Sequence, residues 1–296
     1  MRTAVIDLGT NTFNLLIAEI SDTNFEIIHS EKEGVALGMG GINTNIIAPE
    51  AWFRSVNAIV HFKEVCKSFG VTHIRAIGTS ALRSANNSNE FVQEVVEKTG
   101  ISIEIISGLQ EAEMIFHGVL WSYDFSVPGV IMDIGGGSTE FVWADKNGII
   151  EAMSLDIGVS RIYQSFKLND PLSLEDILII EDWLELNSKG LLNGKTAHLL
   201  IGASGTFETF YELHHRKSFP KSIEAVPIKK SELDRIISNI MVSTLADREN
   251  NDFIIPIRKK MVPIAAVKTR WVMNKLGVSQ ILISPCSLKE GGLRVN

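Results

Sequence analysis

Two short segments of this chain carry residues that could hold a phosphate group. Residues 7–12 read DLGTNT, and residues 133–139 read DIGGGST. Three consecutive glycines weaken any regular element, so bare backbone must be needed there. The N–H groups of such a turn form a concave surface that cradles phosphate oxygens, and the hydroxyl groups add donors. The aspartates that open the two segments, Asp7 and Asp133, are the type of hard oxygen ligand that binds Mg²⁺.

A third candidate segment is IGASGT at residues 201–206, where a strand leads into a helix, a common place for an anion. The predicted phosphate-binding residues of the three segments are Gly9, Thr10, Asn11, Thr12, Gly135, Gly136, Gly137, Ser138, Thr139, Ser204, Gly205 and Thr206. The segment DLGTNT alone could equally be a hairpin turn, but three glycines are wasteful in a hairpin. Two such turns that face each other across a cleft would form one phosphate site.

Two glutamates could activate water beside that phosphate. Glu140 follows the glycine turn directly, and Glu111 lies at the start of a predicted helix. Both have a structural alternative, since a first-turn glutamate favours the helix dipole and a strand glutamate can be solvated. If both face the cleft, one can take a proton from water that attacks a terminal phosphoryl group. Arg83 follows a strand and is predicted to contact phosphate, whereas the basic run at 258–260 is typical of a solvated face.

The elements that must position these residues alternate between strands and helices. Strands are predicted at 3–7, 13–20, 25–33, 72–78 and 102–106, with helices at 49–70, 88–100 and 110–121. Ser88 is a plausible helix cap, and Gly100 a stop. After a short linker at 124–129 the pattern restarts with three strands, followed by helices from Ser173 and from residue 204. A long helix over 255–277 could be kinked at Pro263, and a strand follows it.

The restart of the pattern has a measurable offset. Asp133 follows Asp7 by 133 − 7 = 126 residues, and IGASGT follows IGTSAL by 201 − 77 = 124 residues. Two motif pairs in the same order at nearly the same offset indicate an internal duplication. We therefore predict an α/β fold of two duplicated domains, residues 1–124 and 125–296, with the active site in the cleft between them.

Composition narrows the function classes. The 296-residue chain has a net charge of −7, which argues against a nucleic-acid or membrane partner for the chain as a whole. No apolar run approaches the length of a membrane helix, and the N-terminus lacks an export signal. The two cysteines, Cys66 and Cys286, lie far apart and are expected in the core. We expect a cytoplasmic protein.

These motifs together resemble the exopolyphosphatase/guanosine pentaphosphate phosphohydrolase family of the sugar kinase–actin–Hsp70 superfamily. The matching segments are DLGTNTFNLL, GTSALRSANN, IISGLQEAEMIFHGV, MDIGGGSTEFV, IGVSRI and IGASGT. The resemblance implies two ribonuclease-H-like domains and Mg²⁺-dependent release of phosphate from polyphosphate or guanosine pentaphosphate. It implies that Glu111 and Glu140 are the catalytic pair, that Asp7 and Asp133 hold the metal or position water, and that a homodimer is possible.

Three positions depart from the family pattern and bear on substrate handling. They are Gln110 where an acid is common, Lys260 where many members have an acid, and Ala36 where Arg is frequent. Two other functions stay open: an ATP-dependent phosphotransferase, and a non-catalytic sensor that binds alarmone or polyphosphate. A water-activating glutamate pair argues against the phosphotransferase, because a kinase must exclude water. The sequence does not choose between polyphosphate and guanosine pentaphosphate.

Overall fold

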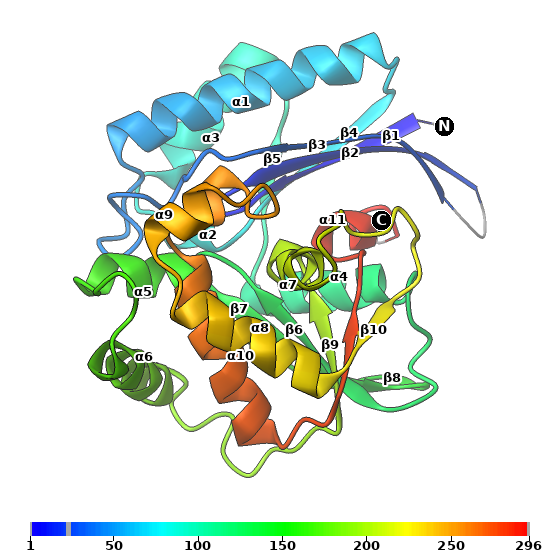
Figure 1. The fold of residues 1–296 in the computed structure, drawn as a ribbon. Coiled ribbons are helices and arrows are strands. Elements are labelled where there is room, and N and C mark those ends of the chain that lie inside the picture. The colour runs from blue at the N-terminus through cyan, green and yellow to red at the C-terminus, as the bar shows by residue number, and fades with distance from the viewer. Residues whose placement is uncertain (1, 22–24, 295–296) are drawn as a thin grey trace.

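Two β-sheets, one in each half of the chain, organise the computed structural model, which describes residues 2–21 and 25–294 (Figure 1). The first half contains β1 (Arg2–Leu8), β2 (Phe13–Ile20), β3 (Phe25–Glu33), α1 (Pro49–Ser68), β4 (His73–Gly78), α2 (Ser80–Ser84), α3 (Ser88–Thr99), β5 (Ile103–Ile105) and α4 (Gly108–Val119). The second half contains β6 (Gly129–Ile134), β7 (Thr139–Asp145), β8 (Gly148–Leu155), α5 (Val159–Ser165), α6 (Leu174–Asn187), β9 (Leu199–Ala203), α7 (Gly205–His215), β10 (Val226–Ile228), α8 (Lys230–Met241), α9 (Leu245–Glu249), a 3₁₀ turn η1 (Pro256–Arg258), α10 (Val262–Leu276), β11 (Gln280–Ile283) and α11 (Leu288–Gly291).

The two sheets repeat one strand order. The first is β3-β2-β1-β4-β5, and the second is β8-β7-β6-β9-β11 with β10 added at its edge. In the first sheet, β1 pairs antiparallel with β2 and parallel with β4. In the second sheet, β6 pairs antiparallel with β7 and parallel with β9. This is the ribonuclease-H-like topology, present twice. The α/β fold and the duplication predicted from the motif offsets are therefore confirmed.

Helices cover the sheets in layers. In Figure 1, α1 and α3 lie on the outer face of the first sheet, and α8 and α10 lie against the second. Between the two sheets, α4 packs on β7, β8 and α11, and α11 also contacts β1 and β2. A separate apolar core fills this central layer. The predicted domain boundary at residue 124 assigns α4 to the first domain, yet α4 packs on the second sheet. The boundary therefore stays a prediction.

Most helix ends follow the sequence signals, and two do not. Gly100 ends α3 in the left-handed conformation, and the Ser173 side chain caps α6 as predicted. The cap prediction at Ser88 is wrong, because Ser88 is already the first helical residue and Asn87 precedes it. The long helix kinked at Pro263 is also wrong. The chain forms η1 and then starts α10 at Val262, since proline fits the first helical turn without losing a hydrogen bond.

A polar seam joins the two halves beside the cleft. The Gly40 N–H donates to Gln164 Oε1 at 2.8 Å, and Asn43 Nδ2 donates to the Arg161 carbonyl at 3.1 Å. Arg161 Nη1 returns a bond to the Ile42 carbonyl at 3.2 Å. These bonds hold the loop before α1 against α5.

Both cysteines are free and buried, as expected. Among the described helices, none is long and apolar enough to cross a bilayer.

Candidate active site

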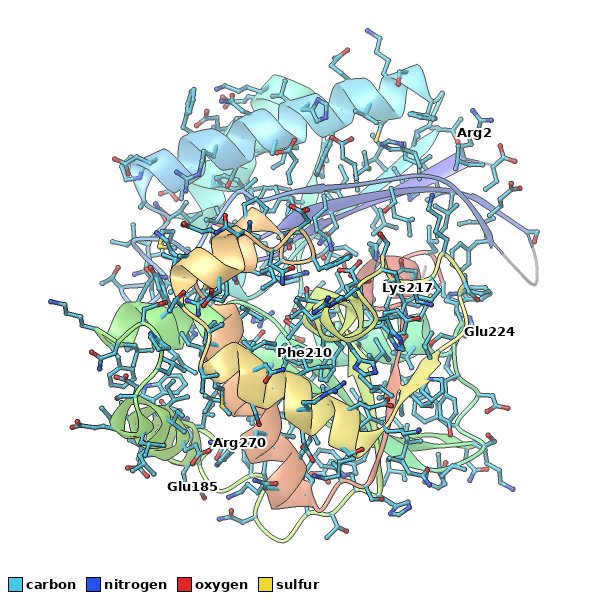
Figure 2. All side chains as sticks on the ribbon, in the orientation of Figure 1. Arg2, Glu185, Phe210, Lys217, Glu224 and Arg270 are labelled. Atoms are coloured by element: carbon cyan, nitrogen blue, oxygen red, sulfur yellow. The ribbon has the colours of Figure 1, made fainter. Side chains whose placement is uncertain are left out.

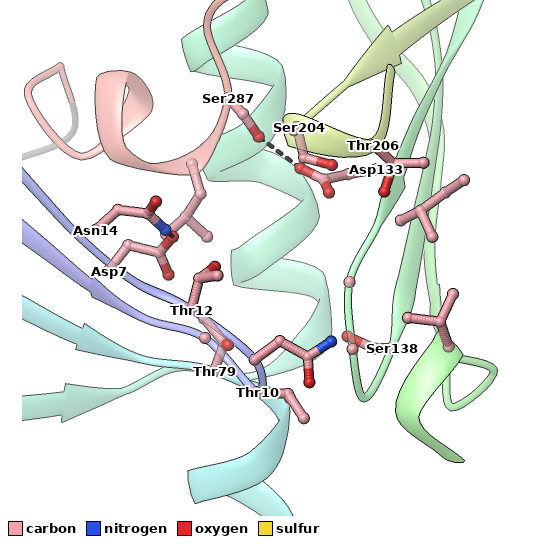
Figure 3. A pocket seen from close by; sticks show the side chains of 18 of the residues that line it. Asp7, Thr10, Thr12, Asn14, Thr79, Asp133, Ser138, Ser204, Thr206 and Ser287 are labelled. Carbon is pink, nitrogen blue, oxygen red and sulfur yellow. Dashed lines mark hydrogen bonds between the residues drawn. The ribbon is translucent and has the colours of Figure 1, made fainter. Parts of the chain in front are cut away.

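A cavity of about 150 Å³ lies between the two halves, and most of the predicted site residues line it. They are Asp7, Gly9, Thr10, Asn11, Thr12, Glu111, Asp133, Gly135, Gly136, Gly137, Ser138, Glu140, Ser204, Gly205 and Thr206. Figure 3 shows Asp7 and Asn14 on one side of the opening, with Asp133 and Ser204 on the other. The predicted phosphate ligands Arg83 and Thr139 do not line this cavity.

The two turns have the same backbone geometry. The Gly9 N–H donates to the Thr12 carbonyl at 3.1 Å, and the Gly135 N–H donates to the Ser138 carbonyl at 3.1 Å. These pairs differ by the duplication offset of 126. The turns are therefore equivalent parts of the two halves, brought face to face by the fold.

Two of the three glycines are needed because the first half packs directly against them. A Cβ on Gly136 would lie 2.8 Å from Asn11 Cγ. A Cβ on Gly137 would lie 2.4 Å from Ser80 Oγ and 2.8 Å from Thr10 Oγ1. Bare backbone thus lets the two turns approach each other, in addition to the phosphate-binding role predicted from the sequence.

The back of the glycine turn is fixed by the segment that leads into α5. The N–H groups of residues 158–160 donate to the carbonyls of Gly137, Gly135 and Gly136, at 3.2, 3.2 and 2.8 Å. The carbonyl groups of the turn are thereby occupied on the α5 side. The side toward the cavity is left to N–H groups and to the Ser138 hydroxyl, which suits an anion.

The acid groups of the cavity sit at matching positions of the two sheets. Asp7 pairs with Asn14 in the β1–β2 register, and Asp133 pairs with Glu140 in the β6–β7 register. Asn14 Nδ2 donates to Asp7 Oδ2 at 2.8 Å, and Ser287 Oγ donates to Asp133 Oδ2 at 2.5 Å. Asn14 therefore occupies in the first half the place that Glu140 occupies in the second.

Glu111 and Glu140 approach the cavity from different elements. Glu111 is in the first turn of α4, where Arg83 Nη1 donates to its Oε2 at 2.9 Å. Glu140 is on β7, and Ser154 Oγ donates to its Oε1 at 2.7 Å. Only 7% of Glu111 and 1% of Glu140 is exposed, so neither is a solvated surface glutamate. Arg83 also donates to the Ile106 carbonyl and thus holds Glu111 in place from behind.

Burial raises the pKa of all four acids. Desolvation is the main cause at Asp7, whose pKa rises to about 7, while the Asn14 hydrogen bond opposes the rise. Burial also raises the pKa of Asp133, against the Ser287 hydrogen bond. The pKa values of Glu111 and Glu140 are raised by burial and then by neighbouring carboxylates. Such a cluster of buried acids is typical of a site that holds a cation or transfers protons.

The raised pKa of Asp7 predicts how stability depends on pH in the presence of a chelator. Between the ordinary pKa of 3.8 and about 7, the folded protein keeps a proton that the unfolded chain has lost. Stability should therefore fall as pH rises through this window and stay lower above it, by a few kcal/mol (roughly 1.4 per pKa unit). Urea unfolding at about pH 5 and about pH 8 measures the slope. Asp7→Asn should flatten it; an equal slope in that variant would contradict the assignment.

Several cavity residues were not predicted from the sequence. Positive charge comes to the wall from three elements: Lys32 on β3, Arg258 in η1 and Lys289 in α11. The acid Glu208, on α7, also lines the cavity. Lys32 Nζ lies 3.8 Å from Glu208 Oε2, which joins the two halves across the cavity. Arg258 is not part of the solvated face that its basic run predicts; it lies over Gly205, where a Cβ would be 1.8 Å from its Nη2.

Two sequence signals could have found more of the wall. The offset of 126 applied to Glu140 leads to Asn14. The pattern Ser-x-x-Glu at 287–290 is a capping box, and in the structure Ser287 N donates to Glu290 Oε2 at 2.9 Å. That box starts α11 and places Ser287 and Lys289 at the cavity.

The three departures from the family pattern have separate places. Gln110 lies outside the cavity and caps α4, since its Oε1 accepts from the Ser107 N–H at 2.8 Å. Ala36 adopts a left-handed conformation, and its N–H donates to the Asn11 carbonyl at 2.9 Å. Lys260 lines an adjoining hollow of about 660 Å³, which shares Thr12 and Lys32 with the cavity.

Two buried hydroxyl groups in the wall make no well-formed hydrogen bond within the described residues, although one of them, on Ser204, lies close enough to Asp133 to oppose the rise in the pKa of that acid. They are the Oγ atoms of Ser80 and Ser204, which differ by the second offset, 204 − 80 = 124. Both residues line the cavity. Buried polar atoms are nearly always paired, so these two hydroxyls are suited to a polar ligand in the cavity.

Residues 16–295 match the model of the Ppx/GppA phosphatase family. The chain belongs to the Ppx/GppA phosphatase family. Within it, the chain is 32% identical to exopolyphosphatase 2 of Mycobacterium tuberculosis, over 98% of this chain and 97% of that protein. The crystal structure of an exopolyphosphatase from Cytophaga hutchinsonii superimposes with a TM-score of 0.94 at 32% identity, over 99% of this chain and 97% of that one.

A bifunctional member of the Ppx/GppA family differs in length. The 3-dehydroquinate synthase/phosphatase of Fusobacterium nucleatum is 30% identical over 95% of this chain, but the chain spans only 44% of that protein. The resemblance that the motifs predicted is thus confirmed at the level of the family.

Proposed function

We propose that this protein hydrolyses a terminal phosphoanhydride and releases orthophosphate, with inorganic polyphosphate or guanosine pentaphosphate as the substrate. The observation that carries the proposal is the convergence of Glu111 and Glu140, from different elements, on one cavity walled by the two turns. Membership of a phosphatase family and similarity to proteins named exopolyphosphatases support it.

The chemistry assigned to the protein is an attack by water. The water oxygen bonds to the terminal phosphorus, the bond to the bridging oxygen breaks, and the shortened chain leaves with that oxygen. A carboxylate of the Glu111–Glu140 pair takes the water proton. The glycine turn and the hydroxyls of Ser80 and Ser204 bind the phosphate oxygens, and Lys32, Arg258 and Lys289 offset their charge.

Asp7 and Asp133 fit a divalent cation. Asp133 is buried and Asp7 is half-buried, each accepts a hydrogen bond at Oδ2 from a neutral side chain, and neither forms an ion pair within the described residues. Mg²⁺ takes few protein carboxylates and completes its shell with water and phosphate. When bound, it would neutralise charge on the phosphate. Within the described residues, the group of three possible ligands within 4.8 Å is Glu31, Glu33 and His61, which does not line the cavity.

Metal addition should stabilise the protein. A cation that binds only the folded state at a hundred times its Kd adds about 3 kcal/mol to the free energy of unfolding. We expect Mg²⁺ to raise the Tm of the wild type. Differential scanning fluorimetry with and without Mg²⁺ measures the shift, and Asp133→Asn should reduce it. An unchanged Tm in the wild type, with Mg²⁺ in large excess, would remove the metal from the proposal.

The proposed function is tested by phosphate release from the purified protein with Mg²⁺. Polyphosphate and guanosine pentaphosphate are compared as substrates, with Glu111→Gln as the control. Release that the variant lacks supports a hydrolase, and the ratio of the two kcat/KM values identifies the preferred substrate. Tight binding of either compound without release would favour a sensor. Formation of ADP from ATP only when an acceptor is present would favour a phosphotransferase.

A further inference from the structure

A lysine that the proposed chemistry does not use is buried behind the glycine turn. Lys268 lies in the middle of α10, and none of its surface is exposed. It does not line the cavity, so it cannot touch a substrate bound there. Its neighbours in α10 are core residues such as Ala265, Ala266 and Val272. A buried ammonium in an apolar core is costly unless its environment compensates it.

The charge of Lys268 has no direct partner of opposite sign. Within the part of the chain that the structure describes, its Nζ makes no ion pair; it donates instead to Thr139 Oγ1 and to the Ile157 carbonyl. Arg270, two residues further on, lies at the surface (Figure 2), and its Nη2 pairs with Glu181 Oε1 at 2.9 Å. Fold stability alone would be served better by an apolar side chain at position 268.

The two acceptors of Lys268 belong to the two segments that shape the glycine turn: the end of the turn itself and the segment that hydrogen-bonds to its back. Thr139 ends the turn and begins β7, directly before Glu140. Ile157 precedes the three N–H groups at 158–160 that bind the carbonyls of the turn. One ammonium group therefore ties the end of the turn to the segment that fixes its back.

Two carboxyl groups of the cavity stabilise the positive charge on Lys268. Burial lowers the pKa of the Lys268 ammonium to about 7, and attraction by Glu140 and then Asp133 opposes the shift. Glu140, one of the proposed catalytic pair, and Asp133, a proposed metal ligand, are thus the charged groups that act on Lys268. A structural lysine elsewhere in the core would have no such relation to the cavity.

We propose that Lys268 is a positioning residue for the hydrolysis: through Thr139 and Ile157, it holds the glycine turn and Glu140 in the geometry that the reacting phosphate needs. This inference rests on the proposed hydrolase function. It accounts for the burial of Lys268, for its two acceptors, and for the position of the predicted phosphate ligand Thr139 outside the cavity.

The test compares Lys268→Met, which keeps length and volume but removes the charge, with Thr139→Val, which removes the hydroxyl acceptor. We expect each variant to lower kcat by about 10-fold or more while KM stays within about threefold, because small displacements of a site act on the transition state. Val272→Ala, one turn further along α10, is the matched control and should keep the wild-type kcat. Urea unfolding confirms that each protein is folded under assay conditions.

A double-mutant cycle separates the proposed contact from two independent effects. If Lys268 acts through Thr139, the double variant should lose no more rate than the worse single variant. Folded Lys268→Met with a kcat within twofold of wild type would overturn the inference, and so would losses that simply multiply. If Lys268→Met does not fold, Thr139→Val decides: an unchanged kcat overturns the proposal. No release by the wild type would instead overturn the proposed function.

Discussion

Glu140→Gln and Glu111→Gln should each lose about 10²-fold or more in kcat while the fold and phosphate binding persist, since that is the usual contribution of general acid–base catalysis. Both side chains are buried in the cavity wall, and glutamine has nearly the same shape as glutamate. The amide cannot take a proton from water. Each variant also removes a buried acid with a raised pKa, so neither should be less stable than the wild type above neutral pH.

The matched control for the glutamate pair is Glu113→Gln. Glu113 lies on α4 two residues after Glu111, and its side chain is 60% exposed. This variant should keep the wild-type kcat. Single-turnover phosphate release and calorimetric binding of inorganic phosphate are the two measurements. Wild-type turnover in both Glu111→Gln and Glu140→Gln would exclude them as the proton-accepting pair.

Gly118→Ala should destabilise the protein by about 1–3 kcal/mol, the typical cost of overpacking a tight core. A Cβ at this position would lie 1.9 Å from the Ser287 carbonyl oxygen, and a backbone group cannot rotate away as a side chain can. At about 2–4 °C per kcal/mol for a domain of this size, the Tm should fall measurably. Thermal unfolding in a calorimeter checks this.

The same substitution should lower activity beyond its effect on stability. Gly118 is on α4, which carries Glu111, and it presses on the residue that donates to Asp133. Gly34→Ala is the control, because its Cβ would only reach ordinary contact with Ile257 Cβ, at 3.4 Å. A Gly118→Ala protein with the wild-type Tm would contradict the close packing of α4 on Ser287.

The sequence was sufficient for the parts of this molecule that depend on local pattern. The offset of 126 predicted the duplication, and the two turns it related have the same hydrogen bond. The strand at 25–33 matches β3 to the residue. Such features are encoded in a few adjacent residues, so periodicity and turn chemistry suffice to locate them.

The parts that were missed depend on contacts between distant segments. Lys32, Arg258 and Lys289 come from three separate elements and meet only because the halves close on each other. Lys268 reads as an ordinary polar position of an amphipathic helix, and only the packing of α10 against the second sheet buries it. The break before α10 was missed because a proline in a helical pattern predicts either a kink or a first turn.

Asn14 and Glu140 occupy equivalent positions in the two halves, and this difference in residue type makes the two sides of the cleft chemically unequal. A cleft made of two identical halves would treat a bound chain the same way from either end. Here Asn14 donates a hydrogen bond to Asp7, whereas Glu140, at the matching place in the other half, can accept a proton. An amide does not ionise, so the two halves differ in whether this side chain can accept a proton. In the proposed hydrolysis, this difference would let the cleft distinguish the two ends of a bound chain, because Glu140 places a proton acceptor on the side of the second half where the first half has only an amide.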